Sequence, residues 1–209
     1  MFTNRSTTGR TTLSATVTIG ALTVLTACAG AGDTTSALTE ATGAPGVLSA
    51  TTARPGASFG NADVGFAQTM IPHHRQAVEM AGLTGRRASD PEVRRIAQGI
   101  GAAQDPEIAT MTGWLSAWGK PVTPGGSHAG HDMPGMVTEA DMAGLRKARG
   151  GKFDRMFLRL MIAHHRGAIE MAGTELAEGV NPEARRLAQT IKDTQRAEIR
   201  RMRELLDRL

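Results

Sequence analysis

Met70-Ile71-Pro72-His73-His74-Arg75-Gln76-Ala77-Val78-Glu79-Met80-Ala81-Gly82 is followed later in the chain by a near copy, Met161-Ile162-Ala163-His164-His165-Arg166-Gly167-Ala168-Ile169-Glu170-Met171-Ala172-Gly173. The offset between the copies, from His73 to His164, is 91 residues, and it holds without a gap from Asp63 and Asp154 to Met111 and Met202. Such a register indicates one supersecondary unit used twice. We expect repeats at residues 63–118 and 154–209, joined by a connection at 119–153.

The composition favours helices. The chain has 209 residues, enough for one ordinary domain plus tails. Hydrophobic residues make up 40% but aromatics only 3%, and 11 residues are Met, so apolar volume comes mainly from aliphatic side chains. In the second helix of the first copy, apolar residues recur at spacings of three and four from Ala97 through Met111 to Trp118, which predicts a buried stripe.

Helix start signals occur at equivalent places in both copies. Asp90-Pro91 and Asn181-Pro182 each combine an N-cap with proline at the first helical position. Asp63 is the expected N-cap of the first helix, which we expect to reach about Gly85, while its counterpart begins near Phe153. The capping box from Thr138 to Asp141 predicts a short extra helix in the connection, to about residue 149, closed by the following glycines.

These elements predict an all-α fold over residues 62–209. One helical hairpin cannot enclose a core, but two hairpins pack readily as an antiparallel four-helix bundle with the long connection between them.

The N-terminus predicts export. Residues 1–27 hold Arg5 and Arg10, then an uncharged apolar run, and they end in Leu-Thr-Ala before Cys28. This is the layout of a signal peptide, and the last residues resemble a bacterial lipobox, in which the cysteine is lipidated. Cys28 is the only cysteine, so the alternative is a free thiol. Residues 28–61 are rich in Ala, Gly, Thr and Ser and are expected to be a lipidated N-terminus and flexible linker.

Charge argues against nucleic acid as a partner. The formal net charge of +4 falls to +2 when the two arginines of the predicted signal peptide are removed. Arg and Glu alternate at helical spacing, as in Arg200, Glu204 and Arg208, which predicts a solvated, paired face rather than a clustered basic patch.

The repeated motif places imidazoles and thioethers on one helix face. At 100° per residue Met70, His73, His74 and Met80 fall on a common face, and Met161, His164, His165 and Met171 repeat it. A methionine stripe alone is often core filling, and a lone histidine is often structural. Burying four imidazoles is costly unless their nitrogens are satisfied, and metal ligation would satisfy them. Glu79 and Glu170 point away, and no Glu-x-x-His occurs, which argues against a di-iron oxidase.

The connection carries a second candidate site. His128, His131, Met133 and Met136 lie within nine positions of a glycine-containing loop. Thioether with imidazole suits copper, since Met favours Cu(I) and His accepts either oxidation state. Zinc sites more often recruit Cys or carboxylate. The alternative is a solvated loop that only happens to hold these residues.

The paired Met-Ile-x-His-His-Arg motifs, the residues from Gln104 to Leu115 and the loop at 130–136 resemble the bacterial domain-of-unknown-function family 305. The likeness covers residues 63–209. It implies a ferritin-like fold and an exported protein that binds copper, Cu(I) or Cu(II), at the His-His and Met faces, with the loop as an accessory site. Pro106 and Leu205 depart from the usual pattern without removing a candidate ligand.

The hypothesis from sequence is a membrane-anchored lipoprotein facing outside the cytoplasm that sequesters copper or passes it to a copper-handling protein. We expect binding rather than catalysis. Two alternatives remain: a metal-dependent oxidoreductase using the same face, and a helical interaction module in which the His-His faces are hydrogen-bonded core.

Overall fold

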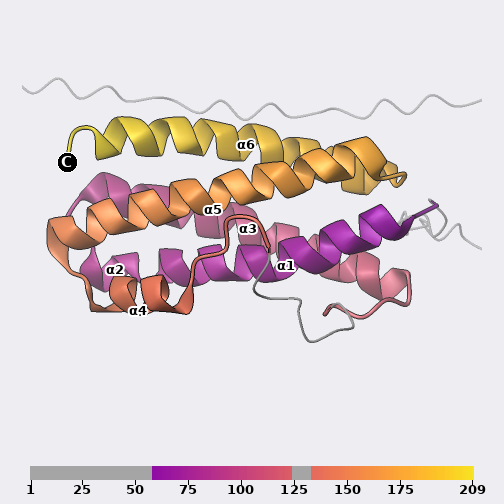
Figure 1. Ribbon diagram of the computed structural model, residues 1–209, viewed down its shortest axis with the longest axis horizontal. Helices are drawn as coiled ribbons and strands as arrows, with labels where there is room; N and C mark the ends of the chain where they lie inside the picture. Colours follow the sequence, from indigo (N-terminus) through magenta and orange to yellow (C-terminus); the bar gives the residue numbers. More distant parts are fainter. Residues whose placement is uncertain (1–57, 124–132) are drawn as a thin grey trace, which may run out of the picture. The chain divides into compact units, whose positions relative to one another are not determined.

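The computed structural model describes residues 58–123 and 133–209. Within these ranges the chain forms helices and no strand, which confirms the all-α class (Figure 1). The helices are α1 (Asn61–Gly82), α2 (Thr84–Arg87), α3 (Pro91–Ala117), α4 (Glu139–Lys147), α5 (Gly150–Glu178) and α6 (Pro182–Leu206). None of the described helices is long and apolar enough to cross a bilayer. The predicted signal peptide, Cys28, most of the linker, His128 and His131 fall outside the described residues.

Three helix starts agree with the sequence. The Asp90 side chain accepts from the amides of Glu92 and Val93 at the start of α3, and Asn181 does the same for residues 183 and 184 at the start of α6. Thr138 caps α4, the short helix expected in the connection. Each cap pairs amides that have no partner within the helix, so these polar residues set where the helices begin.

Three predicted boundaries are wrong. Gly60, not Asp63, is the N-cap of α1, and Asp63 reaches back from the third helical position, where its Oδ2 accepts from Gly60 N at 2.6 Å. The first helix ends at Gly82 instead of Gly85, and the short α2 follows. Gly150 begins α5 instead of closing the preceding helix, because its positive φ of 60° turns the chain directly into the new helix.

Two apolar clusters show how the long helices run. The first half of α1 (Phe66, Met70) clusters with the second half of α5 (Ala168, Ala172), so these helices are antiparallel. We call the two clusters the first core and the second core. The first core includes Met80, Ile96, Ile100, Phe153, Phe157, Met161 and Met202. The second core includes Phe66, Met70, Met111, Leu115, Ala168, Ala172 and Ile191.

The helices form two hairpins. α1 packs mainly on α3, α5 mainly on α6, and the hairpins meet chiefly through α1 and α5, which lie side by side in Figure 1. Each hairpin also holds the other's turn through a buried aspartate. Asp63 accepts from the amides of Val180 and Asn181, and Asp154, its counterpart 91 residues later, accepts from the amides of Ser89 and Asp90. The repeat is therefore reciprocal in contacts as well as in sequence.

Candidate metal centre

A polar layer lies between the two cores. It contains His73, His74, His164 and His165, all fully buried, with Gln104 of α3 and Gln195 of α6. On α3 Gln104 falls between Ile100 of the first core and Met111 of the second. The rings of His73 and His164 come together, with centroids 3.7 Å apart and planes inclined by 34°. The structure thus brings one imidazole from each copy of the motif into contact.

Two carboxylates hold the outer histidines. His74 Nε2 donates to Glu107 Oε2 at 2.8 Å, and His165 Nε2 donates to Glu198 Oε2 at 2.7 Å. Each pair is separated by 33 residues in sequence. Sequence reasoning used these glutamates only to align the repeats and missed their role. The signal was present, because both copies carry Glu at the same distance after the second histidine. A carboxylate on one ring nitrogen leaves the other as the lone pair available to a metal.

The end of the connection covers the layer. Pro134 O accepts from His73 Nε2 at 3.2 Å. Gln76, one turn after His73, bonds both backbone groups of Val137, accepting from its amide at 2.8 Å and donating to its carbonyl at 2.9 Å. Its counterpart in the second copy is Gly167, where an added Cβ would lie 1.9 Å from Pro134 O. Equivalent positions in the two copies therefore contact the same segment. Gln76 binds it through side-chain hydrogen bonds, and Gly167 leaves room for it because glycine has no side chain.

Burial keeps the central imidazoles neutral. Desolvation, followed by the proximity of His74, lowers the pKa of His73 to about 3, although the bond to Pro134 O acts in the opposite direction. Desolvation, followed by His73, also lowers the pKa of His164 well below its usual value. Among the described residues, the Nδ1 atoms of His73, His74 and His165 and both ring nitrogens of His164 have no hydrogen-bond partner. The paired rings of His73 and His164 thus offer neutral, unpaired imidazole nitrogens, the form that ligates metals.

The methionines do not gather in the layer. Met70 belongs to the second core, while Met80 and Met161 are buried in the first. Met171 is half-buried beside the second core. The reason is axial distance: Met70 and Met80 share a face, but ten residues of helix separate them by about 15 Å. Met133 and Met136 are half-buried in the segment that covers the layer.

The described residues contain no group of three or more His, Cys, Asp and Glu side chains placed to hold a metal ion. What the layer offers is the His73 and His164 pair, flanked by thioethers one turn away at Met70 and Met161. Two imidazoles with a soft sulfur suit a cation of low coordination number, such as Cu(I).

Comparison with known proteins gives a family match. A sequence model for the family described as Domain of unknown function (DUF305) matches residues 63–206. A DUF305 protein from Streptomyces coelicolor, described as a candidate secreted protein, is 38% identical, with a TM-score of 0.66 over 70% of this chain and 93% of that one. A DUF305 fragment from Deinococcus radiodurans is also 38% identical, with a TM-score of 0.66 over 72% and 99% of the two chains.

CopM provides the comparison with bound metal. Its Cu(II)-bound structure is 34% identical, with a TM-score of 0.62, and its Cu(I)-bound structure is 32% identical, with a TM-score of 0.60. Both comparisons cover 70% of this chain and 96% of CopM. CopM has also been solved with silver. No curated protein matches the chain significantly.

Proposed function

The chain belongs to the DUF305 family, and from that premise we propose that it binds copper at the polar layer, for sequestration or transfer. The observation that carries the proposal is the His73 and His164 pair: two fully buried, neutral rings in contact, with ring nitrogens unpaired among the described residues. An unpaired buried polar group costs about 1–3 kcal/mol, which a ligated cation would offset.

Oriented histidines support the same site. Glu107 and Glu198 hold the Nε2 atoms of His74 and His165, and Pro134 O holds that of His73. Outer partners of this kind fix the tautomer and raise the basicity of a ligating imidazole. The Nδ1 atoms would then face the metal. Structures of CopM, a protein similar to this chain, with Cu(I), Cu(II) and silver support copper as the metal, and imidazole accepts either oxidation state of copper.

The remaining ligand assignments belong to this proposal. Thioethers one turn from the paired rings would complete the centre, and the remaining ones would be additional ligands. The proposed ligands are His73, His74, His164, His165, Met70, Met80, Met161 and Met171, with His128, His131, Met133 and Met136 as an accessory site.

The proposed setting is the outer face of the membrane. Residues 1–27 would be removed, Cys28 lipidated and residues 28–61 would tether a domain at 62–209, which we propose to be a ferritin-like antiparallel four-helix bundle. A relative described as a candidate secreted protein supports an extracytoplasmic location.

The test is Cu(I) binding by the purified chain against a competing chelator. We expect His73→Ala with His164→Ala to weaken binding at least about tenfold, which is about 1.4 kcal/mol. Met142→Leu is the matched control, since Met142 is a buried methionine outside the proposed ligands. Circular dichroism shows whether each variant is folded. A folded double variant with the affinity of the wild type would rule out the layer as the copper site and favour the non-metal interaction module.

A further inference from the structure

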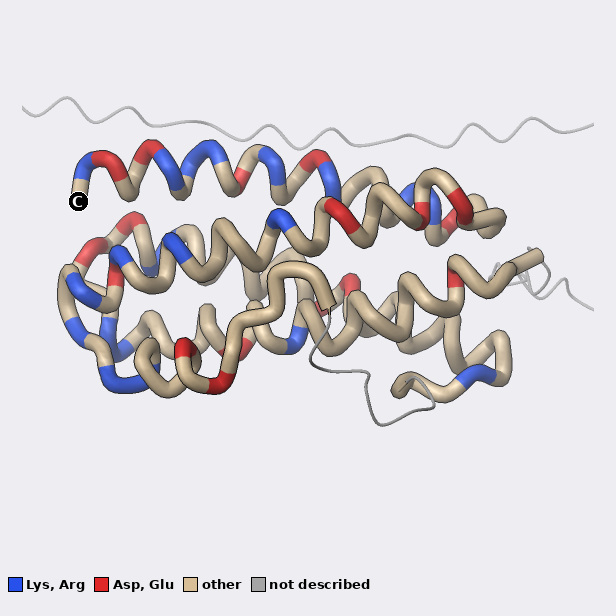
Figure 2. The backbone as a smooth tube through the Cα atoms, in the orientation of Figure 1, with Lys and Arg blue, Asp and Glu red and all other residues tan. Residues whose placement is uncertain are grey.

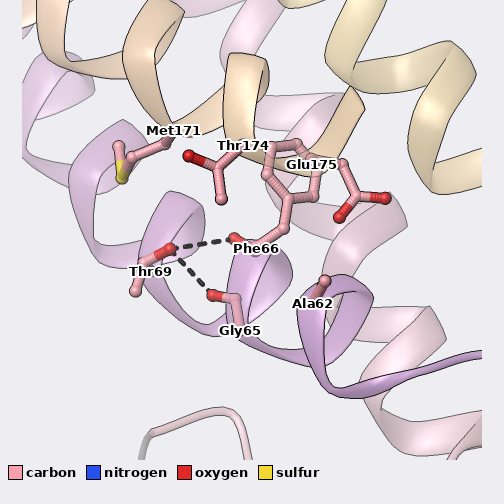
Figure 3. A pocket seen from close by; sticks show the side chains of 7 residues that line it. All are labelled: Ala62, Gly65, Phe66, Thr69, Met171, Thr174 and Glu175. Atoms are coloured by element: carbon pink, nitrogen blue, oxygen red, sulfur yellow. Dashed lines mark hydrogen bonds between the residues drawn. The ribbon is translucent and has the colours of Figure 1, made fainter. Parts of the chain in front are cut away.

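One end of the α1 and α5 interface is hollow. A cavity of about 240 Å³ lies between the start of α1 and the end of α5. Its lining residues are Ala62, Gly65, Phe66, Thr69, Met171, Thr174 and Glu175, and Figure 3 shows Met171 and Thr174 of α5 facing Thr69 of α1. Thr174 is exposed and Met171 half-buried, so the cavity opens to solvent.

The hollow exists because the two copies differ here. The counterparts 91 residues away are larger: Phe153 replaces Ala62, Met156 replaces Gly65, Leu160 replaces Thr69 and Leu83 replaces Thr174. At that end Phe153 and Met80, the counterpart of Met171, are fully buried in the first core. We call the end that buries Phe153 and Met80 the closed end, because its thioether is fully buried, whereas the hollow leaves the Met171 thioether half-buried.

The two ends of the α1 and α5 interface also differ in the charge of their lining residues. No Lys or Arg lines the hollow. At the closed end a surface groove of about 350 Å³ beside Met156 and Leu160 is lined by three cationic side chains, Lys152, Arg155 and Arg159, and by one carboxylate, Asp141. Figure 2 shows Lys and Arg positions in blue along the start of α5. A cation approaching this groove meets three positive side chains and one negative one, whereas a cation approaching the hollow meets no Lys or Arg in its lining.

The second core lies between the hollow and the polar layer, and Phe66 belongs both to this core and to the lining of the hollow. Met171 packs against the second core, which contains Met70. Met70 precedes His73 by one helical turn, and Met171 follows His164 by two turns, about 10 Å along the axis. A soft cation that reaches Met171 thus has a second thioether between it and the imidazoles, and the facing side chains at Ala168 and Ala172 are small.

We propose that the hollow is the port through which a soft monovalent cation, Cu(I) or Ag(I), reaches the polar layer, with the Met171 thioether as its first ligand. This rests on the proposed function of the layer. The rival route is beneath the Pro134–Val137 segment, which covers His73.

The test compares rates of Ag(I) uptake and release by stopped flow, using silver nitrate and the full chain. Thr69→Leu with Thr174→Leu gives the hollow the residues of the closed end, and leucine forms helix better than threonine. Thr110→Leu with Thr190→Leu is the control, because both threonines are exposed on helices and bond a carbonyl four residues earlier, as Thr69 does.

A blocked port slows uptake and release alike and leaves affinity unchanged. We expect both rates to fall at least about tenfold in the filled variant, an added barrier of about 1.4 kcal/mol, and to stay at the wild-type value in the control. Equal rates in the two double variants would overturn the port. The port would also be overturned if Gln76→Ala took up Ag(I) faster than the wild type while Thr69→Leu with Thr174→Leu had no effect. That result would establish the route beneath the Pro134–Val137 segment. A wild-type chain that binds no Ag(I) at equilibrium refutes the proposed function itself, a result distinct from normal binding with unaltered rates.

Discussion

The two copies of the repeat agree in the polar layer and disagree where α1 and α5 meet the connection and the hollow. His73, His74, Gln104 and Glu107 all recur 91 residues later. Gln76 and Gly167 differ, as do Thr84 and Glu175. The duplicated part builds a symmetric centre from both hairpins, and the divergent part makes its surroundings one-sided. A centre that is symmetric inside and asymmetric outside is suited to holding one ligand that enters from one direction.

The largest expected effect tests the symmetric part, through acid. An unfolded histidine gains its proton near pH 6.5, but folded His73 does so only near pH 3. Between pH 6.5 and pH 3 the unfolded state binds a proton at this histidine and the folded state does not. The free energy of unfolding therefore has its full value above pH 6.5 and decreases as pH falls toward 3. For the metal-free protein, we expect His73 alone to cost about 2 kcal/mol between pH 7 and pH 5, with His164 acting in the same direction.

Urea unfolding at pH 7, 6 and 5 measures this loss. In His73→Leu with His164→Leu neither ring remains to be protonated, so the free energy of unfolding should depend less on pH over this range. Burial raises the pKa of Asp63, but hydrogen bonds from backbone amides outweigh burial and lower it overall. Protonation of Asp63 therefore changes the free energy of unfolding only below pH 3.8, outside the range from pH 7 to pH 5. The same acid dependence in the wild type and the double variant would show that the paired rings do not stay neutral in the folded state.

The next effect tests the asymmetric cover. Gly167→Ala would push Cβ against Pro134 O, at 1.9 Å, and against Gly135 Cα, at 2.8 Å. Both are backbone atoms, so the segment must move, and we expect a loss of about 1–3 kcal/mol typical of overpacking. Gly173→Ala on the same helix meets nothing within 4 Å and should stabilise by up to about 1 kcal/mol.

Thermal unfolding compares the two glycine variants, and hydrogen exchange at the Val137 amide reports the segment itself. That amide donates to Gln76 Oε1, so displacement of the segment should increase its exchange in Gly167→Ala alone. If the two variants prove equally stable, with equal hydrogen exchange at the Val137 amide, the absence of a side chain at Gly167 is not needed to hold the Pro134–Val137 segment. The difference between Gln76 and Gly167 then has no structural consequence at the second position.

The symmetric part is also what could be predicted from sequence. The repeat offset, with Asp90 and Asn181 as caps, predicted the long helices and placed a His-His pair on one face of a helix in each copy. That the two faces meet is shown only by the contact of His73 with His164. The pairing of His74 with Glu107 depends on the register between α1 and α3, which no pattern within one helix determines. The contact of Gly167 with Pro134 joins a helix to a loop, so it was equally hidden. The repeat itself marked the histidine–glutamate pairs, because both copies carry Glu at the same distance after the second histidine, whereas a deviation from the repeat marked Gly167.

The smallest effect tests Glu175, which the second copy has in place of Thr84. Desolvation, together with the neighbouring Asp63 carboxylate, raises the pKa of Glu175 to about 8, whereas an unfolded glutamate ionises near 4.5. The folded state therefore binds the proton more tightly, and stability declines as pH rises from 4.5 through 8. Between pH 7 and pH 9 we expect the wild type to lose about 1 kcal/mol.

Glu175→Gln keeps the size of the side chain and a donor for Asp63 without a group that ionises, so chemical unfolding at both pH values should show a smaller loss. Groups that ionise elsewhere act equally in both proteins and cancel in the difference. An equal alkaline loss in both would mean that Glu175 is already ionised at pH 7, and that the hollow end holds two charged carboxylates, Asp63 and Glu175.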